Sequence, residues 1–167
     1  CIFALAATCM GCKDNSEEKA PEATVAPRPP KRVNAPVFDA DSAYTYVAAQ
    51  VAFGPRTPGS AAQAKCAAWM QTKLKPVCDT VYRQEVQVTG GDTKSLPCIN
   101  LVGVINPAAA KRILFLTHWD SRPWADQDTK DRDKPILAAD DGGSGVGVLL
   151  EVARQLKAGH IETRKAV

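Results

Sequence analysis

Two polar motifs, each joined to an apolar segment, place the strongest constraint on what this chain can fold into. The first, His118–Asp120, follows the apolar run Ile113–Leu116 almost directly. The second, Asp140–Gly143, precedes an apolar pattern of helical period over Val146–Leu156. Imidazole and carboxylate groups at the end of a strand and at the start of a helix make a candidate metal site.

The composition is that of a globular protein, with 45% hydrophobic and 23% charged residues. A length of 167 residues suits one ordinary domain. The net charge of +3 is small and scattered, which argues against a nucleic-acid-binding protein. Trp119 and Trp124 lie among carboxylates that would repel a phosphate backbone.

The first residues have the character of an exported protein. Residues 1–11 are apolar with small residues near their end and are too short to span a bilayer, so we expect the remnant of a signal peptide. Gly11-Cys12 resembles a bacterial lipoprotein cleavage site, and we expect Cys12 to carry the lipid. Residues 12–35 are polar and proline-rich, which predicts a disordered tether. The expected location is the bacterial cell envelope, in the periplasm or at the cell surface. The alternative is that the first residues are no export signal but an apolar N-terminus that is frayed or buried.

Three cysteines lie outside this leader, namely Cys66, Cys78 and Cys98. Export would permit a disulfide between Cys78 and Cys98 if their segments lie side by side, and buried free thiols are the alternative. Cys66, Cys78 and Cys98 form no Cys-x-x-Cys, and the one such spacing, Cys9–Cys12, lies in the leader, so a thiolate zinc site is not expected.

Hydrophobic periodicity predicts an α/β domain. Asp39 or Asp41 is expected to cap the first helix. The run at 112–117 is apolar on both faces and is expected to be a central strand. The last residues, Lys165–Val167, read as the start of another strand, so we expect the sequence to be a fragment of a longer protein, truncated at both ends. The predicted helices cover 43–51, 61–74 and 144–157, and the predicted strands cover 80–88, 99–105 and 112–117.

The His-x-Asp spacing places His118 and Asp120 on the same side of an extended chain. A neutral imidazole can bind zinc while a nearby carboxylate orients it. By itself the pattern is a weak signal, since it is more often that of a surface histidine beside a solvated aspartate. His160, the second histidine, lies in a polar tail and is expected to be exposed.

The adjacent carboxylates of Asp140 and Asp141 repel each other unless a cation or several hydrogen bonds offset the charge. One of them is also a candidate N-cap for the following helix. The glycines after them cost helix stability, which indicates close approach to a neighbouring strand or a ligand. The spacing fits neither phosphate-binding glycine motif, and Ser144 is not in a nucleophile elbow. The loop Arg122–Asp126 is either the lining of a small pocket or a packed surface loop.

Taken together, Thr117–Asp126 and Lys134–Arg154 resemble the zinc-dependent M28 peptidase-like family, most of all its bacterial glutaminyl-peptide cyclotransferase branch. Phe53–Ser60 is also similar. The resemblance covers residues 38–167 and makes 36–167 the N-terminal half of a catalytic domain. It implies a three-layer α/β fold with helices on both faces of a mixed, largely parallel sheet.

The resemblance also implies roles for individual residues. Asp141 occupies the position of a zinc ligand, and Asp140 that of its neighbour. His118 matches a ligand of the two-metal aminopeptidases, whereas in the one-zinc cyclotransferases the matching histidine need not bind the metal. Asp120 matches the carboxylate that orients this region. The remaining ligands, a glutamate and a histidine, and the glutamate that acts as general acid and base are expected beyond Val167.

The implied activity is the cyclisation of an N-terminal glutamine to pyroglutamate with release of ammonia, on a peptide or protein substrate. The alternatives are an M28-like zinc aminopeptidase and a non-catalytic envelope lipoprotein on the same scaffold. No nucleic-acid partner is expected, and contact with the membrane is expected through the lipid anchor. The 167 residues by themselves are expected to be inactive and to bind zinc weakly.

Overall fold

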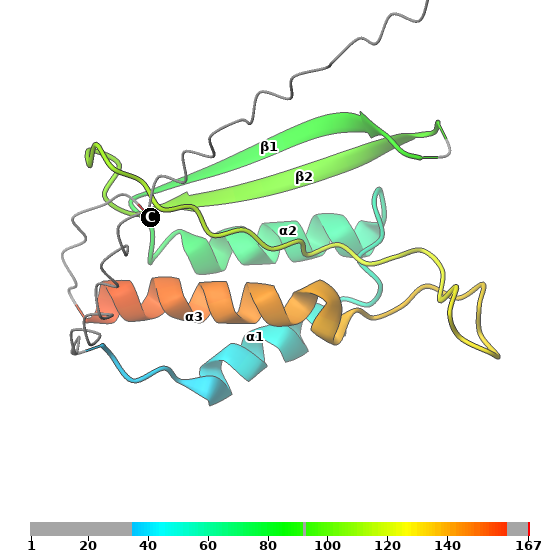
Figure 1. Ribbon diagram of the computed structural model, residues 1–167, viewed down its shortest axis with the longest axis horizontal. Coiled ribbons are helices and arrows are strands. Elements are labelled where there is room, and N and C mark those ends of the chain that lie inside the picture. Colours follow the sequence, from blue (N-terminus) through cyan, green and yellow to red (C-terminus); the bar gives the residue numbers. More distant parts are fainter. Residues whose placement is uncertain (1–34, 92, 160–166) are drawn as a thin grey trace, which may run out of the picture. The chain divides into compact units, whose positions relative to one another are not determined.

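The structure is a computed structural model that describes residues 35–91, 93–159 and 167. The described residues hold three α-helices and one pair of strands (Figure 1). The three predicted helices are confirmed to within a few residues, and α2 has its predicted bounds. In chain order the elements are α1 (Ala40–Ala52), α2 (Ala61–Leu74), β1 (Thr80–Thr89), β2 (Ser95–Val104), the wide helical turn η1 (Ala139–Ser144) and α3 (Gly145–Ala158).

Helix α1 begins where an aspartate satisfies the free N–H groups of its first turn. The Asp39 carboxylate accepts hydrogen bonds from the backbone N–H of Ser42 at 3.0 Å and from its hydroxyl at 2.7 Å. Asp39 is therefore the cap, and Asp41 lies inside the first turn. The helix ends before Gly54, whose φ of +86° is the left-handed conformation that glycine adopts most readily.

Helix α2 begins with a reciprocal cap. Ser60 Oγ accepts from the N–H of Gln63 at 3.0 Å, and the Gln63 side chain accepts from the N–H of Gly59 at 2.7 Å. The predicted apolar side of this helix forms the core, with Cys66 fully buried and Met70 nearly so.

Strands β1 and β2 form an antiparallel hairpin in which Thr80 pairs with Val104 and Thr89 with Ser95. The three cysteines among the described residues, Cys66, Cys78 and Cys98, are free, and the register explains why Cys78 and Cys98 do not pair. Cys98 lies opposite Val86, whereas the Cys78 thiol packs against Gly103 at the other end of the hairpin. Five residues of strand separate the two positions by roughly 16 Å, far beyond the reach of a disulfide.

The predicted central strand at 112–117 is not formed in the part of the chain that the structure describes. Residues 113–117 are extended but belong to no strand, and the side chains of Leu114 and Leu116 are 74% and 82% exposed. A strand needs neighbours for its N–H and C=O groups, and neither strand of the described hairpin pairs with this segment. The apolar pattern of residues 112–117 indicates side chains that favour burial, but it does not indicate whether a partner strand is present.

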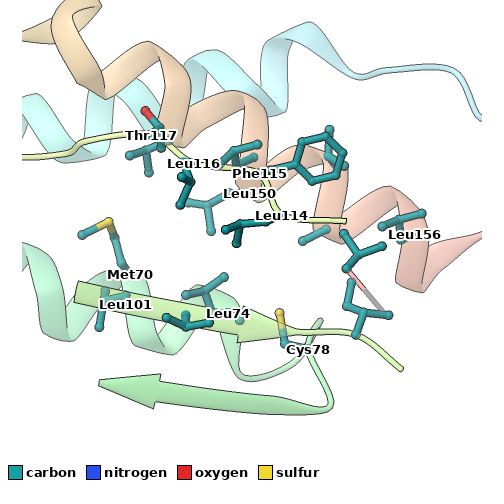
Figure 2. A pocket seen from close by; sticks show the side chains of 18 of the residues that line it. Met70, Leu74, Cys78, Leu101, Leu114, Phe115, Leu116, Thr117, Leu150 and Leu156 are labelled. Carbon is teal, nitrogen blue, oxygen red and sulfur yellow. The ribbon is translucent and has the colours of Figure 1, made fainter. Parts of the chain in front are cut away.

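This extended segment covers an apolar cavity of about 200 Å³. Figure 2 shows Leu114, Leu116 and Leu150 on one side of it and Met70 and Leu101 facing them from the other. Val167, which also lines the cavity, exchanges two backbone hydrogen bonds with Ile105 at 2.7 and 3.0 Å. Thr117 and Trp119, on either side of His118, also line the cavity.

Helices α1 and α3 pack together closely (Figure 1). A Cβ atom on Gly147 would lie 2.7 Å from the carbonyl oxygen of Ala43, so only glycine permits this approach. The buried Glu151 of α3 accepts hydrogen bonds from the N–H of Asp39 at 3.2 Å and from Arg154 at 2.7 and 2.9 Å. The Arg154 guanidinium holds the pKa of Glu151 below its usual value. Among the described helices, none has the length and apolar character needed to cross a membrane.

Candidate metal centre

The structure brings the three predicted site residues together. His118 Nε2 lies 2.6 Å from Asp141 Oδ1, although the two residues are 23 positions apart in the sequence. On the other side of the same ring, His118 Nδ1 lies 3.6 Å from Asp120 Oδ1. The three side chains are about half exposed, so solvent and small solutes reach them. The imidazole is therefore flanked by two carboxylates at an accessible surface.

The turn η1 presents Asp141 to the histidine. Asp141 itself is not helical, with φ −97° and ψ 89°, and its peptide bond to Gly142 is cis. A Cβ atom on Gly142 would lie 2.3 Å from the carbonyl oxygen of His118 and 2.8 Å from its Nε2. A Cβ atom on Gly145 would likewise strike the Thr117 side chain, at 2.2 Å. The glycines therefore serve the close approach that the sequence indicated.

The alternative role of the two aspartates as helix caps is not seen. Ser144 occupies the N-cap position of α3, and no side chain caps that end. The Ser144 hydroxyl donates to the backbone oxygen of Asp140 at 2.6 Å, so it is not directed at His118 as a nucleophile would be. The Asp141 carboxylate is thus available to the imidazole or to a cation.

Two buried polar residues near this turn were not anticipated from the sequence. Gln50 of α1 donates its side-chain amide to the carbonyl of Gly143 at 3.0 Å and to that of Tyr46 at 3.1 Å. Arg56 is fully buried and contacts the backbone of Trp119, in the first motif, and of Ala138, two residues before the second. The only signal in the sequence was a charged residue inside the proline- and glycine-rich segment Phe53–Ser60.

The donor chemistry fits zinc in part. Zinc takes imidazole nitrogen and carboxylate oxygen at about 2.0–2.2 Å, and His118 and Asp141 turn such atoms toward each other. Asp120 stands where a carboxylate would orient the second ring nitrogen of a metal-bound histidine. Within residues 35–91, 93–159 and 167, no group of three or more histidine, cysteine or acidic side chains is placed to hold a metal. The two side chains would therefore supply half of a tetrahedral site.

The loop after this site is held by an ion pair between Arg122 and Asp126, with Nη1 and Oδ1 2.7 Å apart. Trp124 is 56% exposed, as expected for the surface-loop alternative. Cys12 and His160, named above for lipidation and for an exposed tail, lie outside the described residues.

Comparison with known proteins agrees with these motifs. The sequence model of peptidase family M28 matches residues 100–167. The glutaminyl cyclase of Tannerella forsythia is 49% identical, with a TM-score of 0.72 over 74% of this chain and 43% of that one. A Zn-dependent exopeptidase from Parabacteroides distasonis is 48% identical, with a TM-score of 0.71 over 74% of this chain and 43% of that one.

Over residues 100–167 the chain belongs to the M28 peptidase-like family. A third structure, a leucine aminopeptidase precursor from Bacteroides thetaiotaomicron, is 42% identical, with a TM-score of 0.76 over 81% of this chain and 47% of that one. No curated protein matched the sequence. The predicted α/β, zinc-exopeptidase-like fold class is confirmed by these likenesses, and the chain spans less than half the length of the structures it matches.

Proposed function

We propose that the protein is a zinc-dependent glutaminyl-peptide cyclotransferase in which Asp141 and His118 face the metal. The observation that carries the proposal is the contact between His118 and Asp141 with Asp120 behind the ring, in a chain 49% identical to the glutaminyl cyclase of T. forsythia. The sequence Trp119–Asp126, which resembles the cyclotransferase branch, supports this choice within the M28 family.

The proposed reaction closes a ring without water. The α-amino nitrogen of an N-terminal glutamine forms a bond to the side-chain amide carbon, and the bond from that carbon to the amide nitrogen breaks. A proton passes from the α-amine to the leaving nitrogen, so pyroglutamate and ammonia are the products. Bound zinc would polarise the amide carbonyl as a Lewis acid. By the resemblance, the proton carrier is a glutamate beyond Val167.

In this scheme the residues of the present chain bind and orient. Asp141 supplies a carboxylate oxygen from a turn fixed by glycine contacts. His118 supplies an imidazole nitrogen, and Asp120 fixes the ring through the other nitrogen. Their accessibility leaves room for a peptide end to approach.

The test is a product assay on the full-length protein with Gln-peptides and with aminoacyl chromogenic substrates. Pyroglutamate and ammonia without release of a free amino acid are the expected result. Release of the N-terminal amino acid, with no ring closure, would contradict the cyclotransferase assignment.

The second candidate is an M28-like zinc aminopeptidase, which the likeness to the leucine aminopeptidase precursor favours. In that case His118 would be a ligand in a two-metal site, and the metals would supply activation of water for hydrolysis of the peptide bond. Metal analysis separates the two candidates, because the cyclotransferase is expected to hold one zinc and the aminopeptidase two.

The proposed location is the bacterial cell envelope, with Cys12 as the lipidated residue. In cells expressing the full-length protein, Cys12→Ser is expected to move it from the membrane fraction to the soluble fraction. Unchanged membrane association of that variant would contradict lipid anchoring at Cys12. A protein located there that shows neither activity would instead be the non-catalytic envelope lipoprotein.

A further inference from the structure

Arg56 is fully buried and contacts the backbone next to the residues of the candidate metal centre. Its Nε donates to the carbonyl of Trp119 at 3.0 Å, and its two terminal nitrogens donate to the carbonyls of Leu137 and Ala138, each at 2.9 Å. Its own carbonyl accepts from the N–H of Ser121 at 3.2 Å. One residue thus contacts the chain on both sides of Asp120 and the chain that leads into Asp141.

The energetics of this side chain argue against a role in stability alone. Burial lowers the pKa of Arg56, which measures the cost of keeping its charge out of water. Among the described residues no carboxylate lies within ion-pair distance, and the acceptors are backbone carbonyls, including those of Gln50 and Gly54. A buried charge of this kind is a poor source of net stability compared with an apolar side chain of the same size.

The contact with Ala138 shows where the hydrogen bonds act. Ala138 has φ +51°, a left-handed conformation that is unfavourable for an L-residue with a side chain. Its carbonyl accepts from Arg56 and also from the N–H of Gly143 at 3.2 Å. Arg56 therefore helps hold the bend from which the Asp141 turn departs.

We propose that Arg56 is a positioning residue that fixes the backbone of the His118–Asp120 segment against the backbone of the Ala138–Gly143 turn. A planar guanidinium has donors in three directions and can join both segments at once, whereas a lysine ammonium acts from a single point. The consequence for metal binding rests on the function proposed above, but the fixing of the two segments does not.

The first test is hydrogen exchange of the metal-free full-length protein, which needs no zinc. In Arg56→Ala, faster exchange is expected in the peptides that contain the N–H groups of Ser121 and Gly143, and added ethylguanidinium is expected to slow it again. Arg56→Lys keeps the charge and much of the volume, and is expected to show the same local loss. The matched control is Glu151→Gln, a buried charged residue that joins α1 to α3 and touches neither motif.

The second test follows the metal. Substitution of residues that position metal ligands lowers metal affinity by about 10- to 100-fold. We expect that loss of affinity in Arg56→Ala, together with an altered absorption spectrum of bound Co²⁺. Glu151→Gln is expected to lower thermal stability and leave both properties unchanged.

The outcomes separate the two proposals. The Arg56 inference is overturned if exchange in the two segments of Arg56→Ala changes no more than in Glu151→Gln and ethylguanidinium has no effect. If zinc binding does not depend on Asp141, the proposed function fails, and local exchange alone still decides the role of Arg56.

Discussion

At Gly142 the candidate metal centre leaves no space for a side chain. Any side chain at this position would enter the space taken by the carbonyl oxygen and Nε2 of His118. The carbonyl is backbone and cannot turn aside, so the turn or the extended segment would have to move. The distance between the His118 and Asp141 side chains would change with it.

The substitution Gly142→Ala is therefore expected to destabilise the protein by about 1–3 kcal/mol and to weaken zinc binding. Thermal unfolding and zinc titration of the full-length protein measure both effects. Gly91→Ala is the matched control, because a Cβ atom there meets nothing within 4 Å. Equal behaviour of the two variants would show that the contact at Gly142 is unimportant.

The Cys66 thiol gives a second test at this scale. Burial raises the pKa of Cys66 to about 11. At about pH 8 only about one molecule in a thousand would then carry the reactive thiolate. Iodoacetamide is expected to modify Cys66 far more slowly in the native protein than in the unfolded protein, with the less buried Cys98 reacting first. Mass spectrometry of the peptides measures this, and rapid native labelling of Cys66 would contradict the core described here.

Single residues differed in how far the sequence predicted them. Asp141 was predictable because a carboxylate pair beside glycines has few uses, and its family motif lies in consecutive residues. Arg56 was not, because its partners are backbone carbonyls far along the chain. Every residue has a backbone carbonyl, so the sequence does not indicate which carbonyls accept these hydrogen bonds.

Among the elements, α1 and α3 depend on one another through the carboxylate of Glu151. Its pKa is lowered by Arg154 and by the hydrogen bonds of Gln155 and the Asp39 N–H. A lowered pKa in the folded state means that the carboxylate form stabilises the fold at pH above the ordinary value of 4.5. This contribution is lost as the pH falls below that value through the lowered one.

Glu151→Gln is accordingly expected to reduce the loss of stability between about pH 5 and pH 3, while also lowering stability near neutrality. Urea unfolding at a series of pH values measures how steeply the free energy of unfolding changes with pH. Glu85→Gln is the control, since Glu85 pairs with Arg83 on an exposed strand. If Glu85→Gln and Glu151→Gln change the slope equally, the coupling of α1 and α3 through this group is wrong.

The elements themselves were predictable where local chemistry decides. Helix α2 begins at a serine cap and ends before a proline, so both bounds are present in the sequence. The structure of segment 113–117 was not predictable in this way, because the pairing of a strand depends on residues elsewhere in the chain. Its side chains have the pattern of a central strand, but no strand among the described residues pairs with it.

For the whole molecule, the central fact is that the chain spans less than half of each solved relative described above and brings together two candidate ligands. Two ligands bind zinc less tightly than four. A polypeptide of these 167 residues is therefore expected to bind zinc weakly and to show no cyclotransferase activity. Calorimetry and the ammonia-release assay measure the two properties, and rapid turnover by this polypeptide would contradict the ligand assignment.

The most direct test is zinc calorimetry of the full-length protein with Asp141→Asn beside its neighbour Asp140→Asn. Asp141 contacts His118, whereas the contact seen for Asp140 is through its backbone oxygen. One tightly bound zinc in the unsubstituted protein and in Asp140→Asn, with a large loss of affinity in Asp141→Asn, is the predicted result. Tight, stoichiometric zinc that survives Asp141→Asn would contradict the account.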